Sequence, residues 1–253
     1  MGQIFSNVWS AESSQSLISS QTSGSARVLS LHEWKAVAYS LAIAFEHDDV
    51  ARYFVDAPDT TTWTAKEKWE LHLKMLEYVV YAHLLKGLVV TAGDNYECVG
   101  LWMPPGRNMD DHLTILRSGM WRLRYQLSPE GRKRFFQEFL PLLHDTKEVV
   151  MGPRDNTSWY LVYIGTRPEA RGKGLARQVI EFVTREADKH NQACYLESSN
   201  DINPIIYGKM GFNVARKVAL SRSEKPVFMD IMIREPNSSS NGISRSPETT
   251  EKK

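Results

Sequence analysis

The sequence contains little cysteine, little net charge and no long apolar run. Its 253 residues include only two cysteines, Cys98 and Cys194, which argues against the disulfide framework of a small secreted domain. Both lie in apolar runs that we expect to be strands, so we expect buried, reduced thiols in a cytoplasmic protein. The formal net charge is +1, which gives no reason to expect a nucleic-acid partner. No apolar run is long enough to span a bilayer, and the first residues lack the pattern of a secretory signal.

The seven histidines lack the spacing of a metal site. None forms H-x-x-x-H, and none combines with a cysteine in a ligand pattern. We therefore expect no metal cofactor. His72 and His83 fall in an expected helix, where a structural or exposed position is the simpler interpretation.

The composition is that of one large globular domain with a substantial core. Apolar residues make up 42% of the chain and charged residues 24%, values ordinary for such a domain. Residues 1–25 are rich in serine and are expected to be flexible. The domain is expected to occupy residues 26–235. Residues 236–253 lack apolar periodicity and are expected to form a disordered tail.

The first six residues match the N-myristoylation pattern M-G-x-x-x-[ST], with Gly2 as the acceptor and Ser6 at the last position. A single myristoyl chain binds membranes only marginally. No second lipidatable cysteine or basic cluster lies nearby, so any anchoring should be reversible, with part of the protein peripheral to a membrane. An ordinary frayed terminus is an equally good interpretation of these residues.

The glycine-rich segment 171–176 joins an expected strand to an expected helix. The apolar run 159–164 precedes it, and the amphipathic run 175–189 follows it. Glycines allow a ligand to approach the main chain, and the first N–H groups of a helix have no partner within the helix. These groups lie at the positive end of the helix dipole, so the segment is suited to hold a pyrophosphate.

The spacing of this segment distinguishes between phosphate-binding families. Arg177 stands where a dinucleotide fingerprint requires glycine or alanine, and a Walker A loop is absent. The pattern [QR]-x-x-G-x-[GA] does match, through Arg171, Gly174 and Ala176. Six residues alone are also consistent with a surface turn that caps a helix and binds no ligand.

The flanking residues favour the functional interpretation. The run Asn203-x-x-x-Tyr207-x-x-x-Gly211-Phe212 follows a strand that ends near Ser199. Together with segment 171–176, this resembles the GNAT (GCN5-related) N-acetyltransferase family. Residues 100–106 and the run Trp159-Tyr160-Leu161 resemble its puromycin-acetyltransferase-like branch. The resemblance is clear over residues 96–106 and 158–212. The rest of the chain is only compatible with the family.

The resemblance implies an α/β (α+β) fold with a central mixed, mostly antiparallel sheet. Helices flank the sheet, which is splayed at strands four and five. Expected strands are 26–29, 88–92, 96–103, 158–165, 193–198, 214–220 and 227–234. Expected helices begin at the capping boxes Ser30–Glu33 and Thr64–Glu67, and others cover 48–55, 175–189 and 203–210. Helices at 110–125 and 129–149 form an insertion between strands three and four.

The insertion carries aromatic and basic side chains. We expect its aromatic residues to pack against the protein rather than to contact a ligand. They are Trp121, Tyr125, Phe135, Phe136 and Phe139. Its basic residues are expected to form a solvated face. They are Arg117, Arg122, Arg124, Arg132, Lys133 and Arg134.

The resemblance also implies acetyl-CoA as cosubstrate and assigns residues to it. Backbone N–H groups would hold the pyrophosphate. These belong to Arg171, Gly172, Lys173, Gly174, Leu175, Ala176 and Arg177. The pantetheine arm would lie along Ile164, Gly165 and Thr166, as an added strand does. The Ile164 N–H would hold the oxyanion, Asn203 would contact the coenzyme, and Tyr207 would protonate the leaving thiolate.

The acceptor amine must lose a proton before it attacks. An ammonium with a pKa near 10.4 costs about 4.6 kcal/mol to deprotonate at pH 7. Glu197 on the fifth strand is the candidate base, directly or through water, and a carboxylate that only orients local structure is equally consistent with the sequence. Glu97 is a weaker candidate.

Three functions remain open. The first is acetylation of a small-molecule amine by direct attack in a ternary complex. The second is acetylation of lysine or N-terminal amines of proteins, and the third is non-catalytic acyl-CoA binding. Tyr207 argues against the third. The sequence does not indicate the acceptor or the oligomeric state.

Overall fold

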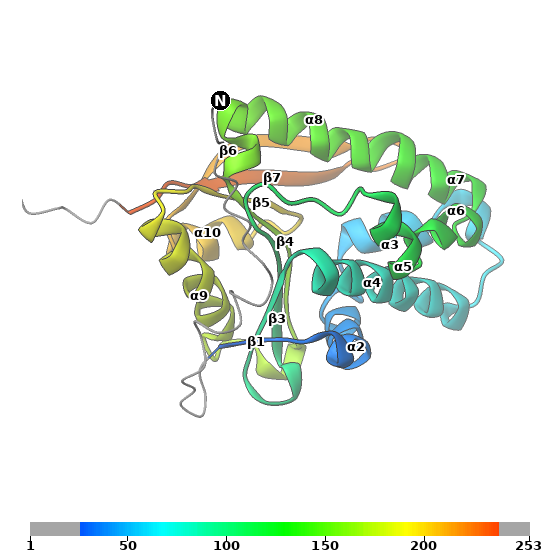
Figure 1. The fold of residues 1–253 in the computed structure, drawn as a ribbon. Coiled ribbons are helices and arrows are strands. Elements are labelled where there is room, and N and C mark those ends of the chain that lie inside the picture. The colour runs from blue at the N-terminus through cyan, green and yellow to red at the C-terminus, as the bar shows by residue number, and fades with distance from the viewer. Residues whose placement is uncertain (1–25, 238–253) are drawn as a thin grey trace, which may run out of the picture.

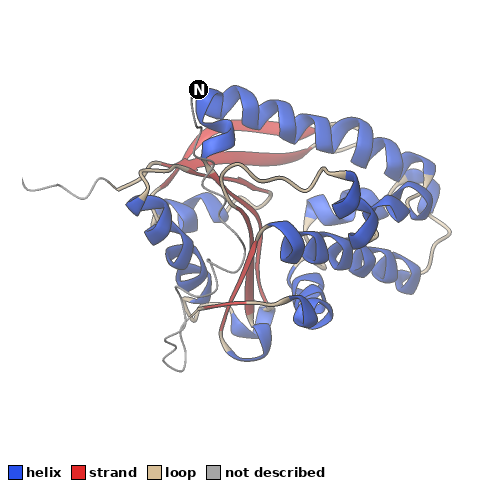
Figure 2. Cartoon of the chain, in the orientation of Figure 1, coloured by secondary structure: helices blue, strands red, loops and turns tan. Residues whose placement is uncertain are grey.

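The computed structural model describes residues 26–237, and these form a seven-stranded mixed sheet with helices on both sides (Figures 1 and 2). The strand order is β1-β2-β3-β4-β5-β7-β6. Every neighbouring pair is antiparallel except β4 and β5, which are parallel. The expected GNAT-like sheet is therefore present. The predictions for residues 1–25 and for most of the tail lie outside the described residues.

The elements follow the expected order. The strands are β1 (Arg27–Val28), β2 (Leu88–Ala92), β3 (Cys98–Met103), β4 (Trp159–Thr166), β5 (Cys194–Ser198), β6 (Phe212–Leu220) and β7 (Val227–Arg234). The helices before the insertion are α2 (Trp34–Ala44), α3 (Asp49–Val55) and α4 (Ala65–Lys86). Those of the insertion are α5 (His112–Ser118), α6 (Leu123–Gln126), α7 (Pro129–Arg132) and α8 (Leu140–Met151). The last two are α9 (Leu175–Lys189) and α10 (Asn203–Gly208).

Three apolar clusters hold the helices to the sheet. The first packs α9 and α10 against the centre of the sheet. The second joins α3 and the insertion to β5, β6 and β7. The third packs α2 and α4 against β2 and β3. In Figure 1, α9 and α10 accordingly lie on one side of the strands and α2 and α4 on the other.

Local sequence signals set several helix starts. Thr64 and Glu67 form the predicted capping box of α4, and Asp48 caps α3 by accepting a hydrogen bond from the Ala51 N–H at 3.0 Å. Both groups satisfy N–H groups that a helix start leaves free. A separate cap on α3 explains why it is a helix distinct from α2.

The hairpin between β2 and β3 differs from the prediction at its end. Tyr96 has φ 61°, a left-handed conformation, so β3 begins at Cys98 rather than at Tyr96. Both cysteines are buried and free, and burial raises the pKa of the Cys98 thiol to about 11. His72 and His83 are buried as well, so the structural interpretation of these histidines is confirmed.

Two expectations for the insertion are wrong. Trp121 and Tyr125 are 43% and 77% exposed, so a large part of each side chain does not pack against the protein. Arg134 is buried instead of solvated, and its guanidinium donates to the Tyr53 carbonyl at 2.8 Å and the Arg222 carbonyl at 2.9 Å. Helix periodicity alone did not distinguish the buried cation from its solvated neighbours.

Candidate active site

The parallel strands β4 and β5 separate after three paired positions. Pairing begins at Trp159 with Cys194 and ends at Leu161 with Leu196. Val162 is skipped in the pairing of β4 with β3, which is a β-bulge at the same point. Within the described residues, the rest of β4 therefore has a strand partner on one side only. An extended ligand can bind along such a free edge.

The glycine loop between β4 and α9 leaves open space around its main chain. Gly172 and Gly174 have φ values of +79° and +75°, and no atom outside the adjoining residues lies within 4 Å of where their Cβ atoms would be. Gly174 is the N-cap of α9 and supplies no side-chain cap. The first N–H groups of α9 are thus available, at the positive end of the helix, for an anion such as a pyrophosphate.

Side chains of the loop fasten it to neighbouring elements. The Arg171 guanidinium donates to the Thr166 carbonyl at 3.3 Å and to the Ala44 carbonyl at 3.4 Å. Lys173 pairs with Glu97 at 2.8 Å. These contacts hold the loop against β4, the end of α2 and the start of β3.

The remaining loop residues contribute their main chain. Leu175 is buried, and Ala176 packs partly against the same cluster, so their side chains belong to the core. The Arg177 side chain points to Glu181, one turn along α9, at 3.3 Å. Their N–H groups still lie in the first turn of α9.

Glu97 does not suit the role of a base. Its pairing with Lys173 lowers the pKa of the Glu97 carboxyl, so this group stays ionised at neutral pH. Glu97 lies beside the glycine loop, so its role is to hold the loop in place rather than to transfer a proton.

The free end of β4 contains the three residues expected along the pantetheine arm. A Cβ at Gly165 would lie 2.8 Å from both the Ala44 and the Phe45 side chains, so glycine is needed for the close packing of α2 on β4. Thr166 donates a hydrogen bond to the Cys98 sulfur at 3.2 Å. Ile164 packs partly against the α9 cluster.

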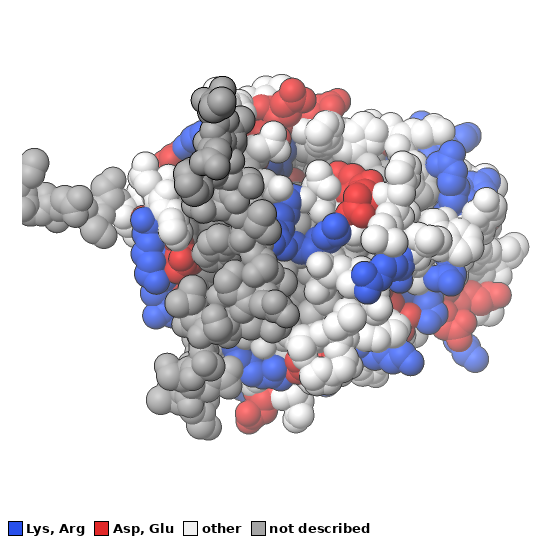
Figure 3. Space-filling view, viewed as in Figure 1, with Lys and Arg blue, Asp and Glu red and all other residues white. Residues whose placement is uncertain are grey.

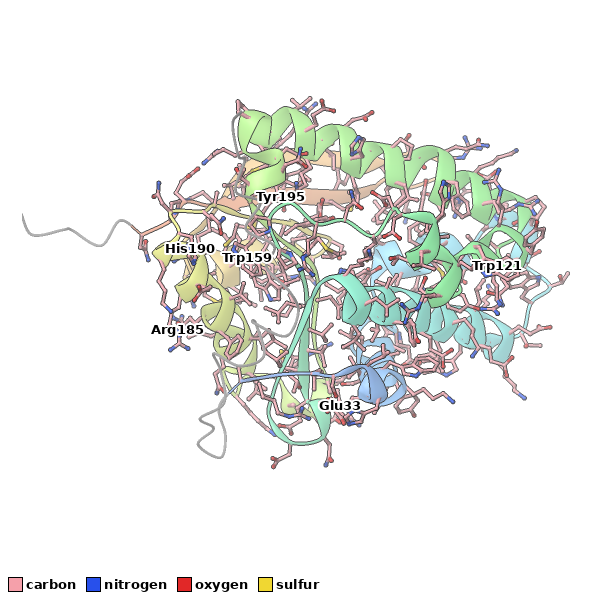
Figure 4. The ribbon with its side chains drawn as sticks, viewed as in Figure 1. Glu33, Trp121, Trp159, Arg185, His190 and Tyr195 are labelled. Atoms are coloured by element: carbon pink, nitrogen blue, oxygen red, sulfur yellow. The ribbon has the colours of Figure 1, made fainter. Side chains whose placement is uncertain are left out.

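Glu197 lies on β5, one residue beyond the last pair with β4. Its Oε1 atom is buried and has no hydrogen-bond partner among the described residues. Burial raises the pKa of this carboxyl from 4.5 to about 7, and the hydroxyl groups of Tyr160 and Tyr195 only partly offset the rise. Such a carboxyl can accept a proton near neutral pH. Figure 4 shows the neighbouring Tyr195 between the strands and α8.

Tyr207 lies on α10 with its ring in the α9 cluster, 7% exposed. Its ring centroid is 6.1 Å from that of Phe212. Burial raises the pKa of Tyr207, and the nearby Cys98 and Asp48 raise it further, so the phenol keeps its proton. Asn203 begins α10, four residues before Tyr207, which places both on one face of the helix.

The sequence did not indicate two groups that the fold brings to this site. Asp48 accepts a hydrogen bond from the Ser199 hydroxyl just beyond β5. Burial raises the pKa of the Tyr163 hydroxyl, and the charges of Asp48 and Glu197 raise it further. The N-cap pattern before α3 could have identified Asp48 as a cap, but no local pattern relates it to Ser199.

Within the described residues, no group of three or more His, Cys, Asp or Glu side chains could hold a metal ion. None of the helices in residues 26–237 has the length and apolar character needed to cross a bilayer. Gly2 lies outside the described residues, so its modification stays a prediction.

Comparisons with known proteins agree with this geometry. The family model of the acetyltransferase (GNAT) domain matches residues 143–214, which include the glycine loop and Tyr207. An uncharacterized N-acetyltransferase of Schizosaccharomyces pombe is 45% identical over 208 residues, which is 82% of either chain. That similarity extends through most of the domain.

Solved structures show the same fold at low identity. A mosquito arylalkylamine N-acetyltransferase-like protein superposes with a TM-score of 0.56 at 15% identity, covering 83% of this chain and 98% of that one. The polyamine N-acetyltransferase of Drosophila melanogaster gives a TM-score of 0.53 at 10% identity, with the same coverage. Given the family model and the S. pombe relative, this chain is an N-acetyltransferase that belongs to the GNAT family.

Proposed function

We propose that this enzyme transfers an acetyl group from acetyl-CoA to the amine of a small molecule, by direct attack in a ternary complex. The observation that carries the proposal is Glu197, a buried carboxyl with a pKa of about 7 and an unpartnered oxygen at the point where β4 and β5 separate. A general base works best when its pKa lies near the working pH.

The residues divide the chemistry between them. Glu197 takes a proton from the bound ammonium, directly or through water. The Ile164 N–H faces the oxyanion that forms when the amine attacks the thioester carbonyl. The bond to sulfur then breaks, and the Tyr207 phenol gives its proton to the leaving thiolate. The resulting phenolate takes back a proton that the new amide nitrogen releases, directly or through water.

The coenzyme fits the features described above. The N–H groups of the glycine loop and of the first turn of α9 hold the pyrophosphate. The free edge of β4 gives the pantetheine arm main-chain partners, as an added strand does. Asn203, on the same face of α10 as Tyr207, contacts the coenzyme near the pantetheine.

The proposed acceptor is an amine that carries a positive charge before it reacts. Asp48 and Glu197 provide carboxyl groups whose charges act on the Tyr163 hydroxyl, and the Tyr160 hydroxyl acts on Glu197. Carboxylates and aromatic faces both attract an ammonium group. The arylalkylamine and polyamine acetyltransferases that share this fold support a small amine, and the resemblance to the puromycin-type branch points the same way.

The proposal extends to where the enzyme acts. Two reduced thiols favour the cytoplasm. The pattern at Gly2 supports a myristoyl group that holds part of the population reversibly at membranes.

A thiol-release assay with acetyl-CoA tests the function. A panel of arylalkylamines, polyamines and aminonucleosides should contain substrates with kcat/KM far above that of lysine peptides and protein N-termini. Higher activity on peptides than on small amines would instead indicate a protein acetyltransferase. Tight acetyl-CoA binding by calorimetry, without turnover of any amine, would indicate a protein that binds acyl-CoA without catalysis.

A further inference from the structure

The insertion has an exposed surface that the catalytic site does not use, the basic–aromatic surface of α5 and α6. Four of its apolar side chains are largely solvent-exposed: Leu113 by 59%, Leu116 by 63%, Trp121 by 43% and Tyr125 by 77%. Arg117, Arg122 and Arg124 are exposed among them. Exposed apolar side chains gathered in one short segment mark a contact site more often than isolated ones do.

The charge of this segment is strongly one-sided. Residues 112–125 contain three arginines and no acidic residue, whereas the whole chain has a net charge of only +1. Among the described residues, Arg117, Arg122 and Arg124 form no ion pair with a carboxylate. Figure 3 shows Lys and Arg side chains among uncharged ones over α5, α6 and α7, at the right of the view.

The aromatic side chains lie among these arginines. The Arg122 guanidinium lies 4.9 Å from the centre of the Trp121 ring, and that ring is 6.3 Å from the Tyr125 ring. Trp and Tyr concentrate at the level of lipid headgroups, where one end of the ring is apolar and the other is hydrated.

We propose that the basic–aromatic surface docks the enzyme on an anionic lipid bilayer. The unpaired arginines complement the negative surface potential of such a bilayer, while Leu113, Leu116 and Trp121 enter the headgroup region. Charge complementarity selects this partner, since the surface combines unpaired cations with exposed leucines, and a nucleic-acid backbone has no use for the latter.

The docking surface is independent of the catalytic site and of Gly2. Figure 4 places Trp121 and Arg185, which lies on α9, on opposite sides of the molecule. One acyl chain alone gives weak membrane binding, and a chain combined with a basic patch gives stable binding. The basic–aromatic surface would therefore add a second membrane-binding signal to the myristoyl chain. At low salt, this surface should also bind anionic membranes without the acyl chain.

Vesicle co-sedimentation of the full-length, unmyristoylated enzyme tests the proposal. We expect binding to phosphatidylcholine vesicles that contain phosphatidylserine, little binding to phosphatidylcholine alone, and loss of binding at high salt, since salt screens exposed charges. The triple variant R117E/R122E/R124E should bind about a hundredfold more weakly. Trp121→Ser combined with Tyr125→Ser should weaken the binding that persists at intermediate salt.

A charge-matched control separates a specific surface from overall charge. The variant R185E/K209E/R216E reverses three exposed arginine and lysine side chains outside the insertion and should bind like the wild type. Melting temperatures and acetyl-CoA affinities of both triple variants should match the wild type, which shows that they fold. The proposal would be overturned if both triple variants lost binding equally, or if the wild type did not bind anionic vesicles. It would also be overturned if R117E/R122E/R124E bound like the wild type, and that result would point to a protein partner for this surface.

Discussion

The Ser199 hydroxyl donates a hydrogen bond to the Asp48 carboxylate, although the two residues are 151 positions apart in the chain. The other carboxylate oxygen of Asp48 caps α3 through the Ala51 N–H at 3.0 Å. One side chain therefore fixes the start of α3 to the end of β5, two residues after Glu197. This link ties the start of α3 to the strand that carries Glu197, the proposed base, whose predictions come first.

Glu197→Gln should remove the base while keeping the shape of the side chain. We expect kcat/KM to fall by about 10²–10⁴-fold, the usual contribution of a positioned base. In the wild type, kcat/KM should rise with pH through about 7, as the Glu197 carboxyl ionises. The rise through pH 7 should be absent from the variant's profile.

Glu97→Gln is the matched control for this profile. The pairing of Glu97 with Lys173 keeps its pKa below the ordinary value, so it does not titrate near pH 7. The inflection should remain in that variant, even if its affinity for acetyl-CoA changes. An inflection near pH 7 that persists in Glu197→Gln would assign the titration to another group.

The same carboxyl should make the stability of the enzyme depend on pH. Its pKa is about 7 in the folded chain and 4.5 as the reference value, so the folded state binds the proton more tightly. The free energy of unfolding should therefore decrease as pH rises from about 4.5 to about 7, by up to about 3 kcal/mol from this group.

Thermal unfolding of Glu197→Gln at several pH values checks the sign. The variant should melt several degrees above the wild type at pH 8, where the wild type carries a buried charge, and should lose this advantage at pH 5. A variant less stable than the wild type at pH 8 would instead show that the carboxylate orients local structure, the alternative that the sequence left open.

Gly174→Asp should weaken acetyl-CoA binding by about a hundredfold, because it adds a negative charge at the proposed pyrophosphate site. The φ of +75° at Gly174 is one that Asp and Asn tolerate better than other residues, and the Cβ meets no neighbour, so the fold should persist. Gly174→Asn is the control of equal size without the charge, and it should lose much less affinity in calorimetry. Unchanged affinity in the Asp variant would place the pyrophosphate elsewhere.

The sequence predicted the elements that local patterns determine. The glycine loop, the capping box at Thr64 and the strand-to-helix order were all predictable, because each depends on neighbouring residues. The Asp48–Ser199 bond, the raised pKa of Glu197 and the burial of Arg134 depend on what distant segments bring near. Trp121 and Tyr125 were predicted to pack against the protein since aromatic residues usually are buried, and only the docking of α5 on α4 shows which face of the insertion stays outside.

Gly2→Ala should move any membrane-bound fraction of the myristoylated enzyme toward the cytosol, because it removes the acyl acceptor. The remaining membrane binding should be salt-sensitive, as expected for a surface held by charge alone. Cell fractionation and intact mass measure the two forms. Identical fractionation, or a Gly2 that is unmodified by mass, would contradict the myristoylation.

Tyr207→Phe separates catalysis from coenzyme binding. The ring packs beside Phe212 in the core, and the raised pKa keeps the phenol protonated throughout the working range of the enzyme. An alkyl thiolate is a poor leaving group at neutral pH, so loss of the proton donor should lower the single-turnover rate by at least about tenfold. Acetyl-CoA affinity should change little, since the ring remains.

Tyr78→Phe provides the control, since Tyr78 and Tyr207 are both 7% exposed. Tyr78 lies on α4, and its hydroxyl donates to Gln126 at 3.0 Å, in the insertion. Its loss should cost about 1 kcal/mol of stability and leave the single-turnover rate unchanged. Rates must be measured in a single turnover, because slow product release would hide a change in the chemical step. If Tyr207→Phe and Tyr78→Phe both turn over like the wild type, Tyr207 serves only packing, and water or another group protonates the thiolate.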